Sequence, residues 1–156
     1  MTNVAYPTVY AALLTLITSA TAPARVTDGY DLSDDPSDVI MLGVPNLSDV
    51  AAISEGTFQQ EQVGHGAAGY VRETGTVNGL AMSWNGDGDA PGARSAVFGL
   101  LASISSAVRA DRHIAVSAFD LVVGPAFPTG DVASDKVDGA TCAVSFAINY
   151  TALLGA

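Results

Sequence analysis

The sequence predicts an α+β fold, with a mostly antiparallel sheet and two helices packed on one face of it. Two segments repeat apolar residues at helical spacing, and the segments between and after them have the period-two alternation of strands. The resulting order is a helix, several strands, a second helix and further strands. No linker is long enough to divide the 156 residues, so residues 1–156 are expected to form a single domain.

The first helix is expected within residues 5–24, with Pro7 in its first turn, where no backbone donor is needed. Its apolar residues recur at i, i+3, i+4 and i+7: Tyr10, Leu13, Leu14 and Ile17. The stretch is apolar enough to imitate a signal peptide, but no Lys or Arg precedes Arg25. It is also too short and too rich in Thr to span a bilayer, so we expect a helix that covers a sheet and no membrane partner.

The block 26–44, VTDGYDLSDDPSDVIMLGV, reads as a short strand, an acidic turn and an apolar strand. The unbroken run at residues 39–42 is typical of a strand covered on both faces. The turn contains several carboxylates, among them Asp31, Asp34, Asp35 and Asp38. Asp, Ser, Gly and Pro are also the residues that an ordinary exposed turn needs. A divalent cation and hydrolytic chemistry at this turn are a remote alternative, because no distant motif completes such a site.

Further strands are expected near residues 57–63, from Tyr70 to Trp84, over 113–123 and over 140–153. Gly75 and Gly79 suggest bulges or a tight bend in the second of these strands. The Pro- and Gly-rich stretch 124–138 is expected to be a loop. The last strand alternates strictly and is a candidate sheet edge for contact with a neighbour.

The second helix is opened by Asp89 and Pro91. Its expected apolar stripe consists of Val97, Leu100, Leu101, Ile104 and Val108. The residues expected to face outward are Arg94, Ser103 and Arg109. This pattern makes it the most clearly defined helix of the sequence.

Composition argues against most catalytic and nucleic-acid-binding classes. Sixteen acidic against six basic residues give a net charge of −10, which disfavours tight binding to a phosphate backbone. The lone Cys142 lies in an alternating strand, where a thiol behaves as a small apolar group. His65 and His113 are too few to build a metal centre, and no nucleophile elbow or phosphate loop is present. No catalytic residue, cofactor or metal ligand is therefore expected.

Five segments together resemble a known family: the N-terminal helix, the block 26–44, RETGTV at 72–77, WNGDGD at 84–89 and the closing GATCAVSFAINYTALL at 139–154. Along nearly its whole length the chain resembles the tail terminator proteins of long-tailed, non-contractile bacteriophages, most closely those of phages that infect actinobacteria. The resemblance implies a structural virion protein that is made in the host cytoplasm. It implies a ring, typically of six copies, that caps the head-proximal end of the tail tube.

The partners implied by this resemblance are further copies of the chain, the major tail tube protein and the head completion or stopper protein. Genomic DNA would pass through the ring without specific binding, because carboxylates lining a lumen repel phosphate. The acidic turn is a candidate for such a lining, through Asp31, Asp34, Asp35 and Asp38. Candidate interface anchors are the aromatic residues Phe58, Tyr70, Phe127 and Tyr150, although burial in the core would explain each of them as well. Another neck connector, a stopper or an adaptor, is the main alternative function.

Overall fold

The computed structural model describes residues 4–31, 33, 37–45, 56–64, 69–116, 120–124, 126–135 and 139–155, with the backbone alone for 127 and 129–135. These residues contain two helices and seven strands. In chain order they are α1 Tyr6–Ala20, β1 Arg25–Asp28, β2 Val39–Leu42, β3 Gly56–Val63, β4 Tyr70–Asn85, α2 Ala90–Ala110, β5 Asp120–Val123, β6 Phe127–Asp135 and β7 Ala140–Leu154.

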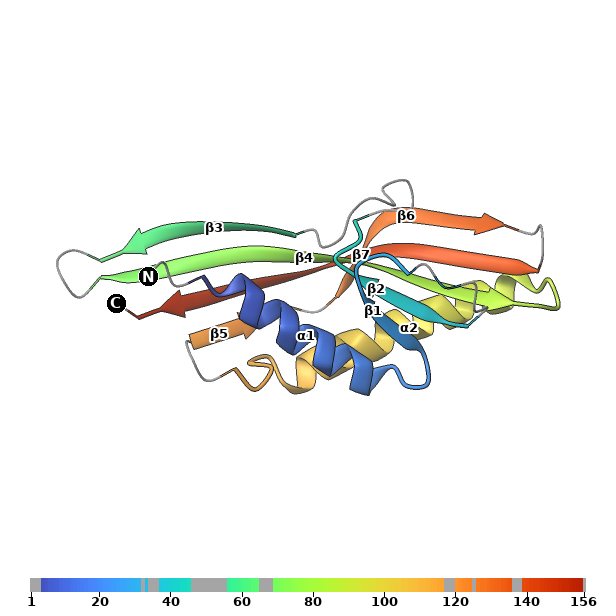
Figure 1. Ribbon diagram of the computed structural model, residues 1–156, viewed down its shortest axis with the longest axis horizontal. Helices are drawn as coiled ribbons and strands as arrows, with labels where there is room; N and C mark the ends of the chain where they lie inside the picture. Colours follow the sequence, from blue (N-terminus) through green and yellow to red (C-terminus); the bar gives the residue numbers. More distant parts are fainter. Residues whose placement is uncertain are drawn as a thin grey trace.

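The sheet is built around a long antiparallel ribbon of β4 and β7 (Figure 1). On the outer side of β4, β3 pairs with one half of the strand and β2 with the other. On the outer side of β7, β5 and β6 likewise take one half each. β1 extends the sheet beyond β2 and is parallel to it, whereas every other pairing between the described strands is antiparallel. The closing strand β7 is therefore internal, and the expectation that it supplies a free sheet edge is wrong.

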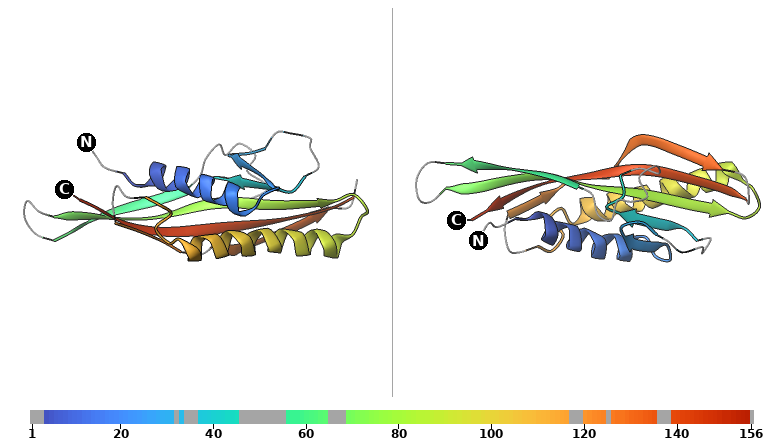
Figure 2. Two further views of the ribbon diagram at one scale, coloured as in Figure 1. Left: turned by 90° about the horizontal axis from the view of Figure 1, so that it is seen from below. Right: turned by 45° about the horizontal axis from the view of Figure 1, so that its top comes forward.

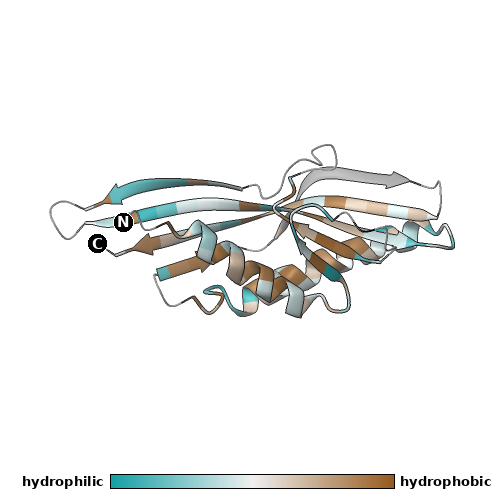
Figure 3. Ribbon diagram, in the orientation of Figure 1, coloured by the Kyte–Doolittle hydropathy of each residue, from teal (hydrophilic) through white to brown (hydrophobic). Residues whose placement is uncertain are grey.

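Both helices lie side by side on one face of the sheet, as predicted from the two apolar stripes (Figures 1 and 2). The main core joins α1 through Val9, Leu13 and Ile17 to the even-numbered residues of β7. Alternate residues of a strand point to opposite faces, so this half of β7 looks toward the helices. Coloured by hydropathy, the helices contain many brown segments, whereas β3 is largely teal (Figure 3).

A second, smaller apolar cluster lies on the opposite face of the sheet. Its buried members are Val39, Met41, Val44, Leu80 and Ala143. The intervening residues Ile40 and Leu42 belong to the main core beneath the helices. All four residues of β2 are thus buried, which confirms the prediction of a strand covered on both faces.

Gly75 and Gly79 form neither a bulge nor a break, contrary to the sequence-based expectation. The β4–β7 ladder runs without a register shift from Val71 opposite Leu154 to Asn85 opposite Ala140. Each glycine instead lies beneath the aromatic ring of its cross-strand partner. A Cβ atom added at Gly79 would come within 2.3 Å of the Phe146 ring. The absence of a side chain thus lets the ring lie flat across the ribbon.

Two further expectations about the second half of the chain are wrong. The expected strand from His113 begins with a turn at 112–115, where Ile114 and Ala115 have positive φ angles of 42° and 55°. The strand β5 starts only at Asp120. The expected loop 124–138 contains the nine-residue strand β6, which pairs with β7 across a register shift between Pro128 and Val132. Proline is compatible with a strand at an edge or a bulge, and β6 provides both.

Candidate functional site

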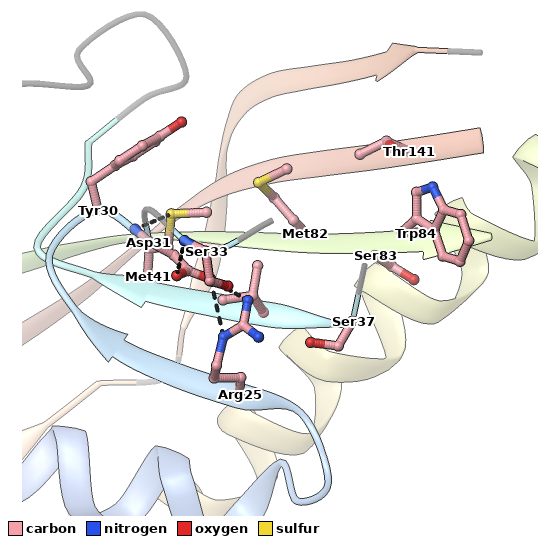
Figure 4. A pocket seen from close by; sticks show the side chains of 11 residues that line it. Arg25, Tyr30, Asp31, Ser33, Ser37, Met41, Met82, Ser83, Trp84 and Thr141 are labelled. Carbon is pink, nitrogen blue, oxygen red and sulfur yellow. Dashed lines mark hydrogen bonds and ion pairs between the residues drawn. The ribbon is translucent and has the colours of Figure 1, made fainter. Parts of the chain in front are cut away.

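A cavity of about 240 Å³ opens on the sheet face that the helices do not cover (Figure 4). We call it the β2–β4 cavity. Its walls come from β1 and the turn after it, from β2, from the end of β4 and from the start of β7. The lining residues are Arg25, Tyr30, Asp31, Ser33, Ser37, Val39, Met41, Met82, Ser83, Trp84 and Thr141.

The floor of the β2–β4 cavity is apolar and its rim is aromatic. Val39 and Met41 are buried and pack with the partly buried Met82 in the smaller apolar cluster. Two rim residues remain accessible, Tyr30 at 38% and Trp84 at 39% exposure. Methionine adapts its shape to a contacting group, and tyrosine and tryptophan are enriched in protein–protein contacts. A volume below the roughly 300 Å³ of typical small-molecule pockets suits an inserted side chain better than a cofactor.

Trp84 reaches the rim because two glycines leave room for its indole. A Cβ atom at Gly86 would lie 2.6 Å from the indole ring, and one at Gly139 would lie 3.0 Å from its Nε1 atom. These glycines belong to the WNGDGD turn and to the start of the closing strand. Their lack of side chains therefore positions the exposed aromatic ring at the mouth of the cavity.

An ion pair forms the polar wall of the β2–β4 cavity. The guanidinium of Arg25 pairs with the carboxylate of Asp31, to which its Nε donates a hydrogen bond of 3.0 Å. The backbone N–H of Ser33 donates a second bond to Asp31. Burial raises the pKa of Asp31, but the Ser33 and Arg25 bonds and the Arg25 charge outweigh it, so that pKa lies below its usual value. The wall therefore stays ionised at neutral pH with little net charge.

The lowered pKa of Asp31 predicts a loss of stability in acid. A carboxyl with a lower pKa when folded stabilises the fold above its unfolded pKa, and this contribution is lost as the pH falls through the folded pKa. Asp31→Asn should cost roughly 1.5–3 kcal/mol at pH 7, the range for bonds to a charged group. The cost should shrink as the pH falls through the folded pKa. Urea unfolding at several pH values would measure it, and a cost that does not change with pH would contradict this prediction.

The other carboxylates of the acidic turn are only partly described. Asp38 is half-buried and accepts a 2.7 Å hydrogen bond from the Ser83 hydroxyl, so it ties the turn to β4. Asp34 and Asp35 lie outside the described residues. Asp31 and Asp38 are thus both held by partners within the chain. That any of the four acids faces a lumen remains a prediction.

The four expected aromatic anchors fall into three groups. Phe58 and Tyr70 are exposed at 46% and 57%, both on the β3–β4 hairpin. Tyr150 is 3% exposed and donates a hydrogen bond to Glu73, so it is a core residue and cannot serve as a surface anchor. The side chain of Phe127 lies outside what the structure describes. The exposed aromatics at the cavity were not among the predicted anchors, although Trp84 was expected on a strand that ends there.

The buried carboxylate of Glu73 is a second polar centre, which was not predicted from the sequence. Its oxygens accept hydrogen bonds from the Tyr150 hydroxyl at 2.7 Å, from the Gln60 amide at 2.8 Å and from the Ala5 N–H at 3.1 Å. We call these four residues the Glu73 cluster. Burial and the bond to Glu73 raise the pKa of Tyr150. Ala5 caps α1, so the carboxylate also lies at the positive end of that helix.

Groups that could hold a metal ion or act as a nucleophile are few among the described residues. No three of their His, Cys, Asp and Glu side chains gather in a way that could hold a metal ion. Cys142 is buried, and this burial raises the pKa of its thiol, which disfavours the reactive thiolate. None of the helices in this part of the chain is both long and apolar enough to cross a membrane.

Neither the comparison with protein-family models nor the comparison with curated proteins finds a match to this chain.

Proposed function

We propose that this chain is a structural assembly protein that forms a ring at the head-proximal end of a phage tail tube, ends tube growth and joins the tail to the neck. One observation carries the proposal. Three segments on which the resemblance to tail terminators rests are far apart in the sequence but contribute to the same cavity. Asp31 and Met41 come from the block 26–44, Trp84 from the WNGDGD turn and Thr141 from the closing strand.

The position of the β2–β4 cavity suits this role. It lies opposite the helix layer, on the sheet face where a flat neighbour can approach without displacing α1 or α2. The apolar floor and the aromatic rim provide the buried centre that a stable protein contact needs. In this proposal a side chain of the adjoining tube or neck protein enters the cavity, and growth ends because the opposite side of the ring lacks a matching surface. The acidic balance keeps passing DNA from binding.

Electron microscopy of the purified protein, alone and mixed with tail-tube protein, tests the proposal. Six-fold rings at one end of tubes, with tube length limited when the protein is present, are the expected result. Twelve-fold rings, or particles that ignore tubes and bind the head portal, would contradict tube capping and favour another neck connector. Counting subunits and recording where the ring binds separates these outcomes.

Truncation of Trp84 should weaken the proposed contact with the tail. Trp84→Ala removes the exposed ring at the cavity mouth, and we expect at least a roughly tenfold loss of affinity for tube ends. Val122→Ala is the matched control, because Val122 is similarly exposed, at 41%, but lies on β5, away from the cavity. Cosedimentation with preformed tubes would measure both variants. Equal binding by Trp84→Ala and wild type would exclude the cavity as the contact.

A further inference from the structure

The charges of the chain are unevenly distributed along the sequence. The net charge is −10, yet α2 contains no Asp or Glu in its 21 residues. Three of the six basic residues, Arg94, Arg109 and Arg112, lie in α2 or directly after it. Helix α2 therefore forms a basic strip on an otherwise acidic molecule.

The two arginines of α2 are exposed and lie outside its buried stripe. The helix buries Ala93, Val97, Leu101, Ile104 and Val108 against the sheet. Arg94, Phe98, Ala102 and Arg109 are all exposed, and their helical spacing places them on one sector of the helix, beside the buried stripe. We call these four residues the α2 outer face. Neither of its arginines forms an ion pair with any described residue.

The centre of the α2 outer face is apolar. Phe98 is 41% exposed between the two arginines. A Cβ atom added at the next residue, Gly99, would meet no atom within 4 Å, so no contact inside the described chain requires a glycine there. Glycine weakens a helix interior, and the described contacts reveal no role by which Gly99 would stabilise the subunit. An exposed aromatic flanked by arginines has the composition of a contact surface.

We propose that the α2 outer face binds the acidic surface of a second copy of this chain. Copies that each carry a charge of −10 repel one another, and a contact in which opposite charges meet would offset that repulsion. Within the described chain, the α2 outer face supplies the positive side of that contact. Exposed carboxylates such as Asp28, Asp87 and Asp89 supply the negative side.

A contact of this kind joins two different patches and can repeat around a closed ring. The inference rests on the proposed function, because only a ring of identical subunits requires copies of this acidic chain to bind one another. It leaves the β2–β4 cavity free for the tube or neck protein, since that cavity lies on the opposite side of the sheet from α2. The α2 outer face can therefore be changed without altering a residue that lines the cavity.

The test compares assembly of the wild type with that of the double charge reversal Arg94→Glu, Arg109→Glu by sedimentation velocity. We expect the wild type to assemble at moderate salt, where the repulsion between copies of charge −10 is screened, and to dissociate at higher salt as the opposite-charge contact is screened too. The reversed variant should self-associate at least about tenfold more weakly. Arg94→Lys, Arg109→Lys keeps the charge and should assemble. Arg72→Gln changes an exposed arginine of β4 and should not affect assembly.

Three results would overturn the inference. One is a charge-reversed variant that is folded, as judged by circular dichroism, and assembles like the wild type. If the rings of that variant still cap tubes, the proposed function stands and only the α2 contact is excluded. A second is a wild type that stays monomeric at high concentration at every salt concentration. The third is that the charge reversal abolishes binding of a DNA duplex but leaves self-association unchanged, because the α2 outer face would then bind nucleic acid.

Discussion

Glu73→Ala is expected to destabilise the fold by about 3 kcal/mol or more. The substitution removes the acceptor for the Tyr150 hydroxyl and the Ala5 N–H, both of which are buried. Each buried donor left without a partner costs roughly 1–3 kcal/mol. Gln60 is exposed and can turn to water, so its bond adds less. Urea denaturation would measure the loss, and amide hydrogen exchange would show whether the start of α1 opens first.

Two further variants separate the role of Glu73 from a general effect of losing a charge. Glu61→Ala is the matched control, because Glu61 is exposed, lies on the neighbouring strand and is 3.8 Å from Arg72. It should change stability by less than about 0.5 kcal/mol. Adding Tyr150→Phe to Glu73→Ala removes one of the orphaned donors and should recover part of the loss. A Glu73→Ala variant as stable as the wild type would contradict the structural role of the cluster.

Gly79→Val is expected to prevent stable folding or to cost more than about 3 kcal/mol. A Cβ at this position would lie 2.3 Å from the Phe146 ring, which is 1% exposed and enclosed by the core. Overpacking of a filled core typically costs roughly 1–3 kcal/mol, and here the ring is enclosed on all sides. Expression yield and urea unfolding would report the effect.

The cause of the Gly79 effect can be isolated with a second site. Phe146→Ala removes the ring and should itself cost about 3–5 kcal/mol through the cavity that it leaves. If the clash with the ring explains the effect, the double variant will be less destabilised than the sum of the single ones. Gly99→Ala, at a helix position without neighbours among the described residues, should stabilise the fold by up to about 1 kcal/mol. Additive effects of Gly79→Val and Phe146→Ala would contradict the proposed clash.

Most regular elements could be predicted from the sequence because their burial follows a simple period. The stripe Val97 to Val108 predicts α2, and the alternation of β7 predicts a strand whose even-numbered residues are all buried, although residues 142–148 are buried on both faces. The strand β6 was missed because Pro128 and Gly130 signal a loop, whereas the existing edge of β7 supplies the partner that makes a strand. Tertiary pairing overrides local preference in such cases.

The sites were harder to predict than the elements. Glu73 shares the strand parity of Val77 and Ala81, both buried beneath the helices, so a charged residue on that apolar face was a usable signal in the sequence. Its partners Ala5 and Tyr150 could not be inferred, because they depend on how α1 and β7 approach β4. The β2–β4 cavity combines four segments in the same way. The spacing of residues along the chain does not reveal which distant segments come into contact.

The central ribbon also determines the order in which the protein can fold. Paired residues of β4 and β7, from Asn85 with Ala140 to Val71 with Leu154, are separated by the whole of α2, β5 and β6. Contacts so distant in sequence make folding slow. During synthesis, β4 cannot pair with β7 until β7 has left the ribosome. Until then, the apolar residues of β4 lack this partner. We therefore expect subunits to become competent for assembly only after β7 has emerged, and a chaperone would be most useful before that point.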